Sequence, residues 1–122
     1  MEFRDNEAIY LQIAGYVSEN IMLGKWSMGE KIPSVRELAV ELQVNPNTVV
    51  RTYEFLQHRE VIANKRGIGF FATDNAINNI KNYRKERFLK QELPEFFRNI
   101  YLLNIGLDEI ADRFEKFKSE NY

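Results

Sequence analysis

The stretch from Glu30 to Thr73 constrains the fold of this chain more than any other part, because it carries local start and stop signals for two short helices and a hairpin. Ser34 and Glu37 have the spacing of a capping box, in which the serine hydroxyl and the glutamate carboxylate each accept the other residue's backbone N–H. Pro33 disfavours helix on its N-terminal side. A first helix is therefore predicted after Ser34, with a buried stripe of Val35, Leu38, Ala39 and Leu42.

A second short helix follows the tight connection Gln43-Val44. Asn45 is a favourable N-cap residue, and Pro46 suits the first helical position, where a missing N–H costs nothing. The helix is expected to run from Pro46 to about Arg59, with an inner face of Val49, Tyr53 and Leu56. On or near its exposed N-terminal face we expect Asn45, Asn47, Thr48, Arg51 and Thr52. Two short helices joined by a tight turn form a helix-turn-helix, whose second helix can enter a DNA major groove.

The residues after the second helix predict a β-hairpin with a basic tip. One strand is expected at Val61-Ile62-Ala63-Asn64 and the other at Gly69-Phe70-Phe71-Ala72-Thr73, joined by the turn Lys65-Arg66-Gly67. The phenylalanines favour strand, and the glycines suit a tight reversal. A hairpin directly after a helix-turn-helix is a wing. The fold class is therefore mostly α with a small β-hairpin, a winged helix-turn-helix domain.

A scaffold helix is predicted ahead of this stretch, from Ala8 to about Leu23, because apolar residues recur there at helical spacing. Gly24 can end it in the left-handed conformation. The residues Met1 to Glu7 are polar and are expected to form a loose arm. Trp26 and Met28 are expected to fill the space between the helices.

These residues resemble the GntR family of bacterial winged helix-turn-helix repressors. The resemblance is carried by the runs IPSVRELAVELQV, NPNTVVRTYEFL and KRGIGFF, and it covers Ala8 to Thr73. The Asn-Pro-Asn-Thr-Val run and the short chain after the wing look most like the YtrA subfamily. The resemblance implies that Arg36 and the start of the second helix contact DNA, and that the wing tip inserts a side chain into the minor groove. The expected DNA-binding residues are Lys31, Ser34, Arg36, Asn45, Asn47, Thr48, Arg51, Lys65, Arg66 and Gly67.

Three positions depart from the family pattern. Many relatives read guanine with arginines where this chain has Pro46 and Val50, so base readout must be weaker or different here. Arg51 is the remaining arginine of the second helix, and the alternative to DNA contact is an ion pair with Glu54 or Glu37. The family usually ends this helix with glycine where this chain has Glu60, which either adopts a strained left-handed conformation or ends the helix differently.

After Asn75 the chain changes character, so residues 1–75 are expected to form the DNA-binding domain and residues 76–122 a helical dimerisation and effector-response region. A charged helix is expected from Ala76 to about Leu93, with Ile77, Ile80, Tyr83 and Phe88 on one side. An apolar helix then runs from Pro94 to about Leu103, and a last helix from Leu107 to about Ser119. Too short for a core of its own, this region is expected to bury apolar side chains against a second copy. The expected dimer contacts are Phe96, Phe97, Ile100, Tyr101, Ile110, Phe114 and Phe117.

Composition excludes several classes of function. The chain has no cysteine, and its one histidine, His58, has no partner at ligand spacing, so neither a metal site nor any cofactor is expected. No pattern of catalytic residues is present, and we expect no enzyme. No apolar run could cross a membrane, which makes a cytoplasmic protein the default. The net charge of −1 does not by itself indicate a nucleic-acid binder, but the cations cluster at the expected docking residues.

The sequence therefore predicts a homodimeric transcriptional regulator. Its expected partners are double-stranded DNA, a second copy and a small-molecule effector of unknown identity. Repression of transcription from an inverted-repeat operator is the expected activity. Two alternatives stay open. A winged helix can also serve as a protein-interaction module, and it can bind DNA without sequence preference as an architectural protein.

Overall fold

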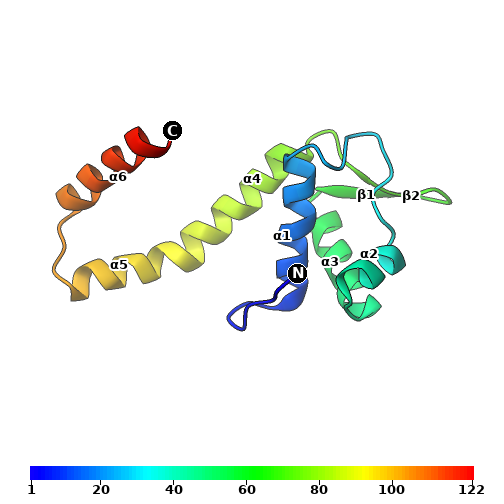
Figure 1. The fold of residues 1–122 in the computed structure, drawn as a ribbon, viewed down its shortest axis with the longest axis horizontal. Helices are drawn as coiled ribbons and strands as arrows, with labels where there is room; N and C mark the ends of the chain where they lie inside the picture. Colours follow the sequence, from blue (N-terminus) through cyan, green and yellow to red (C-terminus); the bar gives the residue numbers. More distant parts are fainter. The chain divides into compact units, whose positions relative to one another are not determined.

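A computed structural model describes residues 1–122, which divide into two compact units, Met1–Tyr83 and Arg84–Tyr122. The elements along the chain are α1 (Ile9–Met22), α2 (Val35–Leu42), α3 (Pro46–His58), β1 (Ile62–Lys65), β2 (Gly69–Ala72), α4 (Ala76–Arg87), the π-helical turn η1 (Phe88–Glu92), α5 (Leu93–Leu102) and α6 (Leu107–Asn121) (Figure 1). The two strands pair antiparallel. A mostly helical fold with one small hairpin, as predicted, is confirmed.

The core of the first unit lies between α1, α2 and α3. Each helix contributes one buried stripe, in which the side chains recur every three or four residues. The stripes comprise Ile13, Ala14, Val17 and Ile21 of α1, Leu38, Ala39 and Leu42 of α2, and Val49, Tyr53 and Leu56 of α3. The predicted inner faces of α2 and α3 are therefore confirmed, although Val35 is only half-buried.

Local capping sets the ends of α2. The backbone N–H of Ser34 donates to Glu37 Oε1 over 2.9 Å, and the N–H of Glu37 donates to Ser34 Oγ over 3.1 Å, so both halves of the capping box are present. At the other end Gln43 has a φ of +55°, and the N–H of Val44 reaches the carbonyl of Ala39. This Schellman closure turns the chain sharply into α3.

The hairpin forms a short sheet against the core. Ile62 pairs with Ala72 and Lys65 with Gly69, and the N–H of Ile68 closes the turn onto the carbonyl of Lys65. The loop before α2 adds a further rung, because the N–H of Ile32 donates to the carbonyl of Phe70 over 2.9 Å. The wing is thus attached to the segment that leads into α2.

At the end of α3, Glu60 stands where the family usually has glycine, and it adopts the left-handed conformation. Glu60 has a φ of +59°, its N–H donates to the carbonyl of Gln57, and the N–H of Val61 donates to the carbonyl of Leu56. A non-glycine residue therefore occupies the left-handed position of a Schellman motif. The side chains of Thr73 and Asn79 both donate to the Glu60 carbonyl, which holds this peptide in place.

The first unit extends beyond the predicted boundary at residue 75. The buried face of α4 consists of Ala76, Ile80 and Tyr83, whereas Ile77, expected on that face, is 38% exposed. These three buried side chains complete the core, so the compact unit ends only after Tyr83. Phe88, also expected on that side, is 47% exposed and is the first residue of the π-helical turn η1.

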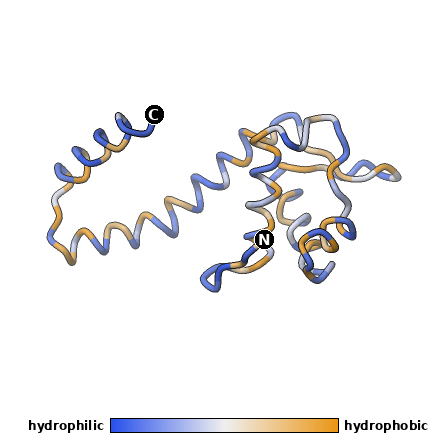
Figure 2. The backbone as a smooth tube through the Cα atoms, viewed as in Figure 1, coloured by the Kyte–Doolittle hydropathy of each residue, from blue (hydrophilic) through white to orange (hydrophobic).

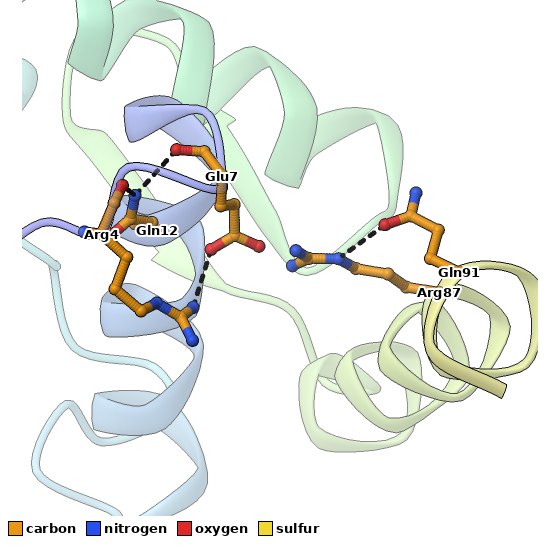
Figure 3. A network of polar contacts seen from close by, with 5 residues as sticks. All are labelled: Arg4, Glu7, Gln12, Arg87 and Gln91. Atoms are coloured by element: carbon orange, nitrogen blue, oxygen red, sulfur yellow. Dashed lines mark hydrogen bonds and ion pairs between the residues drawn. The ribbon is translucent and has the colours of Figure 1, made fainter. Parts of the chain in front are cut away.

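Two expectations about loops are wrong. The arm before α1 is not loose, because Gln12 is buried and its amide donates to the carbonyls of Arg4 and Glu7 while accepting the N–H of Arg4 (Figure 3). Met28 is 55% exposed rather than buried between helices. Trp26 is half-buried and packs edge to face on Tyr16, at a centroid distance of 6.1 Å.

The second unit consists of helices whose apolar side chains are largely exposed to solvent. The Nε of Arg87, the last residue of α4, donates to Oε1 of Gln91 in η1 over 3.4 Å (Figure 3). Hydrophobic and hydrophilic residues alternate along α5 and α6 (Figure 2). Asn104 takes a left-handed conformation after α5, which closes as α2 does. None of the helices combines the length and the apolar character that crossing a membrane requires.

Candidate nucleic-acid interface

The N-terminal end of α3 is built to present polar side chains. Asn45 is extended and its Oδ1 accepts the N–H of Asn47 over 2.8 Å, while Pro46 occupies the first turn. This cap uses the side-chain oxygen Oδ1 of Asn45 and leaves the side-chain N–H₂ group able to donate to DNA. Asn47 is exposed and Thr48 half-buried. An amide, a hydroxyl and a helix N-terminus are groups that bind phosphate oxygens and base edges.

Arg51 projects from the second turn of α3 and lies over the ring of Tyr10. Its Cζ is 3.9 Å from the ring centroid, so the guanidinium makes a cation–π contact with α1. The predicted alternative, an ion pair with Glu54 or Glu37, is not what the structure shows. Thr52, expected near the exposed face, is fully buried, and its hydroxyl donates to the carbonyl of Tyr10 over 2.8 Å.

The start of α2 places Arg36 on the surface beside the capping box. The hydrogen bonds from Ser34, first that from its backbone N–H, hold the pKa of Glu37 below its usual value. Glu37 therefore stays ionised and completes the cap. The Ser34 oxygen in turn accepts the N–H of Glu37, so the Ser34 side chain is committed to the cap.

The wing carries its cations in two different ways. Arg66 and Gly67 form the exposed tip, and Gly67 has a φ of +78°, which a tight turn requires at this position. Lys65 lies over the ring of Phe71, with Nζ 4.3 Å from the centroid. Lys31 lies across Gly69, where an added Cβ would come within 2.6 Å of the lysine Cε. Packing against the sheet thus orients both lysines, whereas Arg66 extends from the turn.

All ten predicted DNA-binding residues belong to the first unit and come from three places, the approach to α2, the first turns of α3 and the wing tip. The seven expected dimer residues lie in the second unit, where five are exposed and Ile100 and Ile110 are half-buried.

Sequence reasoning missed Tyr10 as a partner of Arg51. Tyr10 is one of the residues that recur at helical spacing along α1. Nothing in the spacing connects the start of α1 with the second turn of α3, because their contact depends on how the two helices pack. Only the presence of an aromatic residue beside an otherwise unpaired arginine could have suggested it.

A pocket of about 470 Å³, open to solvent, lies at the other end of α3. Its lining combines side-chain amides with the carboxylates of Glu60 and Asp74, and includes the base of the hairpin and the first turn of α4. Since the candidate DNA-binding residues of α3 lie at its N-terminal end, this pocket is separate from them.

Comparison with known proteins agrees with this geometry. The model of the family described as bacterial regulatory proteins, gntR family, matches residues 9–72, from α1 to the end of β2. A crystal structure from Bacteroides thetaiotaomicron, assigned to the GntR family of transcriptional regulators, is 49% identical and covers 94% of this chain and 100% of that chain, with a TM-score of 0.82.

Two further similarities bear on function. The HTH-type transcriptional repressor YtrA of Bacillus subtilis is 28% identical over 96% of this chain and 89% of its own length. The DNA-binding domain of AraR in complex with its operator ORR3 is 26% identical, covering 60% of this chain and 86% of that chain, with a TM-score of 0.53.

Proposed function

The chain belongs to the gntR family of bacterial regulatory proteins, and we propose that it is a homodimeric repressor. As in other helix-turn-helix transcriptional regulators, its target is proposed to be DNA, here an inverted-repeat operator. The observation that carries the proposal is the capped N-terminus of α3, which leaves Asn47, Thr48 and Arg51 accessible in its first turns. In a helix-turn-helix this end of the second helix enters the major groove.

We propose that residues of α3 read the bases, whereas most of the other DNA-binding residues contact phosphates. Arg51 can donate to the O6 and N7 of guanine, Asn47 can pair with adenine, and the Thr48 methyl can contact thymine. Lys31, Arg36, Asn45 and Lys65 are proposed to bind phosphates and set the register. With Pro46 and Val50 in place of the family's arginines, α3 offers few guanine-reading donors, which makes Arg51 the main one.

The wing tip is proposed to reach the minor groove. Arg66 is exposed at the centre of a turn, and Gly67 permits the close backbone approach that such an insertion needs. A narrow A·T-rich minor groove attracts arginine through its enhanced negative potential. Arg66 therefore favours A·T pairs beside the major-groove contacts.

Dimerisation is proposed to use the apolar side chains of α5 and α6. Phe97, Tyr101, Phe114 and Phe117 are each about half exposed or more within one chain. Large exposed apolar surfaces mark interaction sites, and a second copy offers the same surface in return. A small-molecule effector acting on these helices would change the spacing of the two DNA-binding domains.

The test is a titration of the protein against the DNA upstream of its own gene and a scrambled duplex, at two salt concentrations. Specific binding predicts a preference of about 10³-fold or more for the natural DNA, with log K falling linearly as log salt rises. Equal binding to both duplexes would point to an architectural protein, and no binding to either at low salt would favour a protein-interaction module.

The residue assignment is tested by Arg51→Ala and Arg66→Ala. Each is expected to weaken binding to the preferred duplex by about 1–3 kcal/mol. Arg113→Ala is the matched control, because Arg113 is an exposed arginine of α6 that pairs with Glu109. A loss of binding in the control equal to that of Arg51→Ala would show a general effect of charge.

A further inference from the structure

Tyr10 contacts two consecutive residues of α3 at once. The Arg51 guanidinium lies 3.9 Å above its ring centroid, and the Thr52 hydroxyl donates to its backbone carbonyl over 2.8 Å. The Thr52 side chain is fully buried, and its hydrogen bond fixes the start of α1 against α3. The Tyr10 ring is therefore held at a fixed position beside the exposed Arg51.

Other aromatic residues hold the Tyr10 ring in turn. Phe55 packs edge to face on Tyr10, with centroids 6.3 Å apart and planes at 76°. Tyr83 packs edge to face on Phe55 at 5.4 Å, and its hydroxyl is hydrogen-bonded to Ser18 over 2.6 Å within the core. The Tyr10 ring is thus the outer end of a packed row, which limits its movement.

Stacking leaves the guanidinium able to bind DNA. A cation–π contact uses the flat face of the guanidinium, whereas its N–H donors all point outward in the plane. The two donors that pair with guanine O6 and N7 therefore remain available while the face rests on the ring. An unsupported arginine would lose more rotamer freedom when it ordered on a base.

We propose that Tyr10 is a positioning residue that sets base specificity through Arg51. Its ring holds the guanidinium in an orientation that presents the edge to the major groove. The inference rests on the proposed function, since it requires Arg51 to read a base. Tyr10 itself need not touch DNA.

The test uses full-length protein and a duplex selected from a random library with the wild-type chain. Binding is measured for that duplex and for every single base-pair substitution within it. Tyr10→Leu is expected to weaken binding to the selected duplex by about two- to fivefold for each bound subunit, the loss of one exposed cation–π contact. Tyr10→Phe keeps the ring and is expected to bind as the wild type does.

A double-mutant cycle separates positioning from a structural effect. In an Arg51→Ala background, Tyr10→Leu should change affinity no further, and both variants should relax discrimination at the same base pair. With Arg36→Ala, whose arginine makes no contact with a ring, the effects should simply add. Thermal melting midpoints confirm that each variant used is folded.

Different failures have different meanings. If Arg51→Ala leaves affinity and discrimination unchanged, the base-reading role assigned under the proposed function is wrong, and this inference falls with it. If Arg51→Ala weakens binding but Tyr10→Leu weakens it equally with and without Arg51, or if Tyr10→Leu has no effect, the positioning role alone is overturned.

Discussion

Glu60 occupies a left-handed backbone position at the end of α3, with a φ of +59°. The position is fixed from both sides, because the Schellman bonds close the helix and Thr73 and Asn79 bind the Glu60 carbonyl. None of these contacts involves the Glu60 side chain. The strain of an L-residue here is therefore not offset by anything that the carboxylate does in the folded unit.

Glu60→Gly is expected to raise the free energy of unfolding by about 0.5–1 kcal/mol, the left-handed strain less the entropy that glycine adds to the unfolded chain. Urea denaturation measures this change. Glu54→Gly is the matched control, because Glu54 is exposed in the middle of α3 and glycine there should lower stability by about 1 kcal/mol. A loss of stability at both positions would contradict the strain argument.

Tyr53 is a second residue whose environment predicts a measurable effect. Its hydroxyl donates to the carbonyl of Pro33 over 2.6 Å, and its side chain is 1% exposed. Burial raises the pKa of Tyr53 well above its ordinary value, and the carboxylates of Glu37 and Glu41 add to the shift. The hydrogen bond joins α3 to the loop that leads into α2.

Alkaline pH should therefore destabilise the first unit through Tyr53. The unfolded chain loses the tyrosine proton near pH 10, whereas the folded chain keeps it, so this contribution is complete below pH 10 and declines above it by about 1.4 kcal/mol per pH unit. Unfolding in urea at pH 9 and pH 11 measures the decline. Tyr53→Phe should lack this part of the decline, and at pH 7 should cost about 1 kcal/mol for the lost hydrogen bond. An equal decline in both proteins would exclude Tyr53 as its source.

Among the elements, α4 shows how a helical register decides which side chains stabilise the first unit. Ile80 is fully buried, whereas Ile77, one turn earlier, is 38% exposed. Ile80→Ala is expected to lower the free energy of unfolding by about 2–5 kcal/mol through loss of buried contacts. Ile77→Ala should change it by no more than about 0.5 kcal/mol. Urea denaturation of both variants is the test, and equal losses would contradict a register of α4 that buries Ile80 and exposes Ile77.

Elements whose ends depend on nearby residues were predictable from the sequence. The capping box of Ser34 and Glu37 locates the start of α2, and Asn45 with Pro46 locates the start of α3, because each acts through bonds to its own helix. The helix start at Ala76 was predicted, but the register in which α4 packs was not predictable in this way. Its apolar residues permit two registers, and only packing against α1 and α3 selects the one that buries Ala76.

In the candidate site, too, features set by nearby residues were predictable, whereas features set by long-range packing were not. The polar residues at the start of α3 and the basic wing tip could be located from motifs. The burial of Thr52 and the stacking of Arg51 on Tyr10 could not, because both depend on the contact between α1 and α3. Long-range packing therefore determines which of the predicted residues are accessible and how they are oriented.

For the whole molecule, the two units differ in how their apolar side chains are covered. The first unit buries its own core, whereas no residue of α5 or α6 is fully buried. Side chains such as Tyr101, which is 84% exposed, leave α5 without a partner in a single chain. Folding of the first unit should thus be independent of association, while DNA binding to two half-sites should require it.

Replacing Phe97 and Phe114 together by glutamate is expected to separate these two properties. The charges would lie in the proposed dimer contact, where they could not be buried without a large cost, so the chain should sediment as a monomer. Asn99→Glu, at an exposed position of α5, is the control for added charge and should leave the dimer intact. The monomer should retain the cooperative unfolding of the first unit and bind one half-site about as well as before. It should lose the additional affinity for a duplex with two half-sites about 10 bp or a multiple of that apart.

A variant that still sediments as a dimer would show that α5 and α6 are not the association surface. A monomer whose preference for two half-sites over one is unchanged would show that dimerisation in solution contributes nothing to operator recognition.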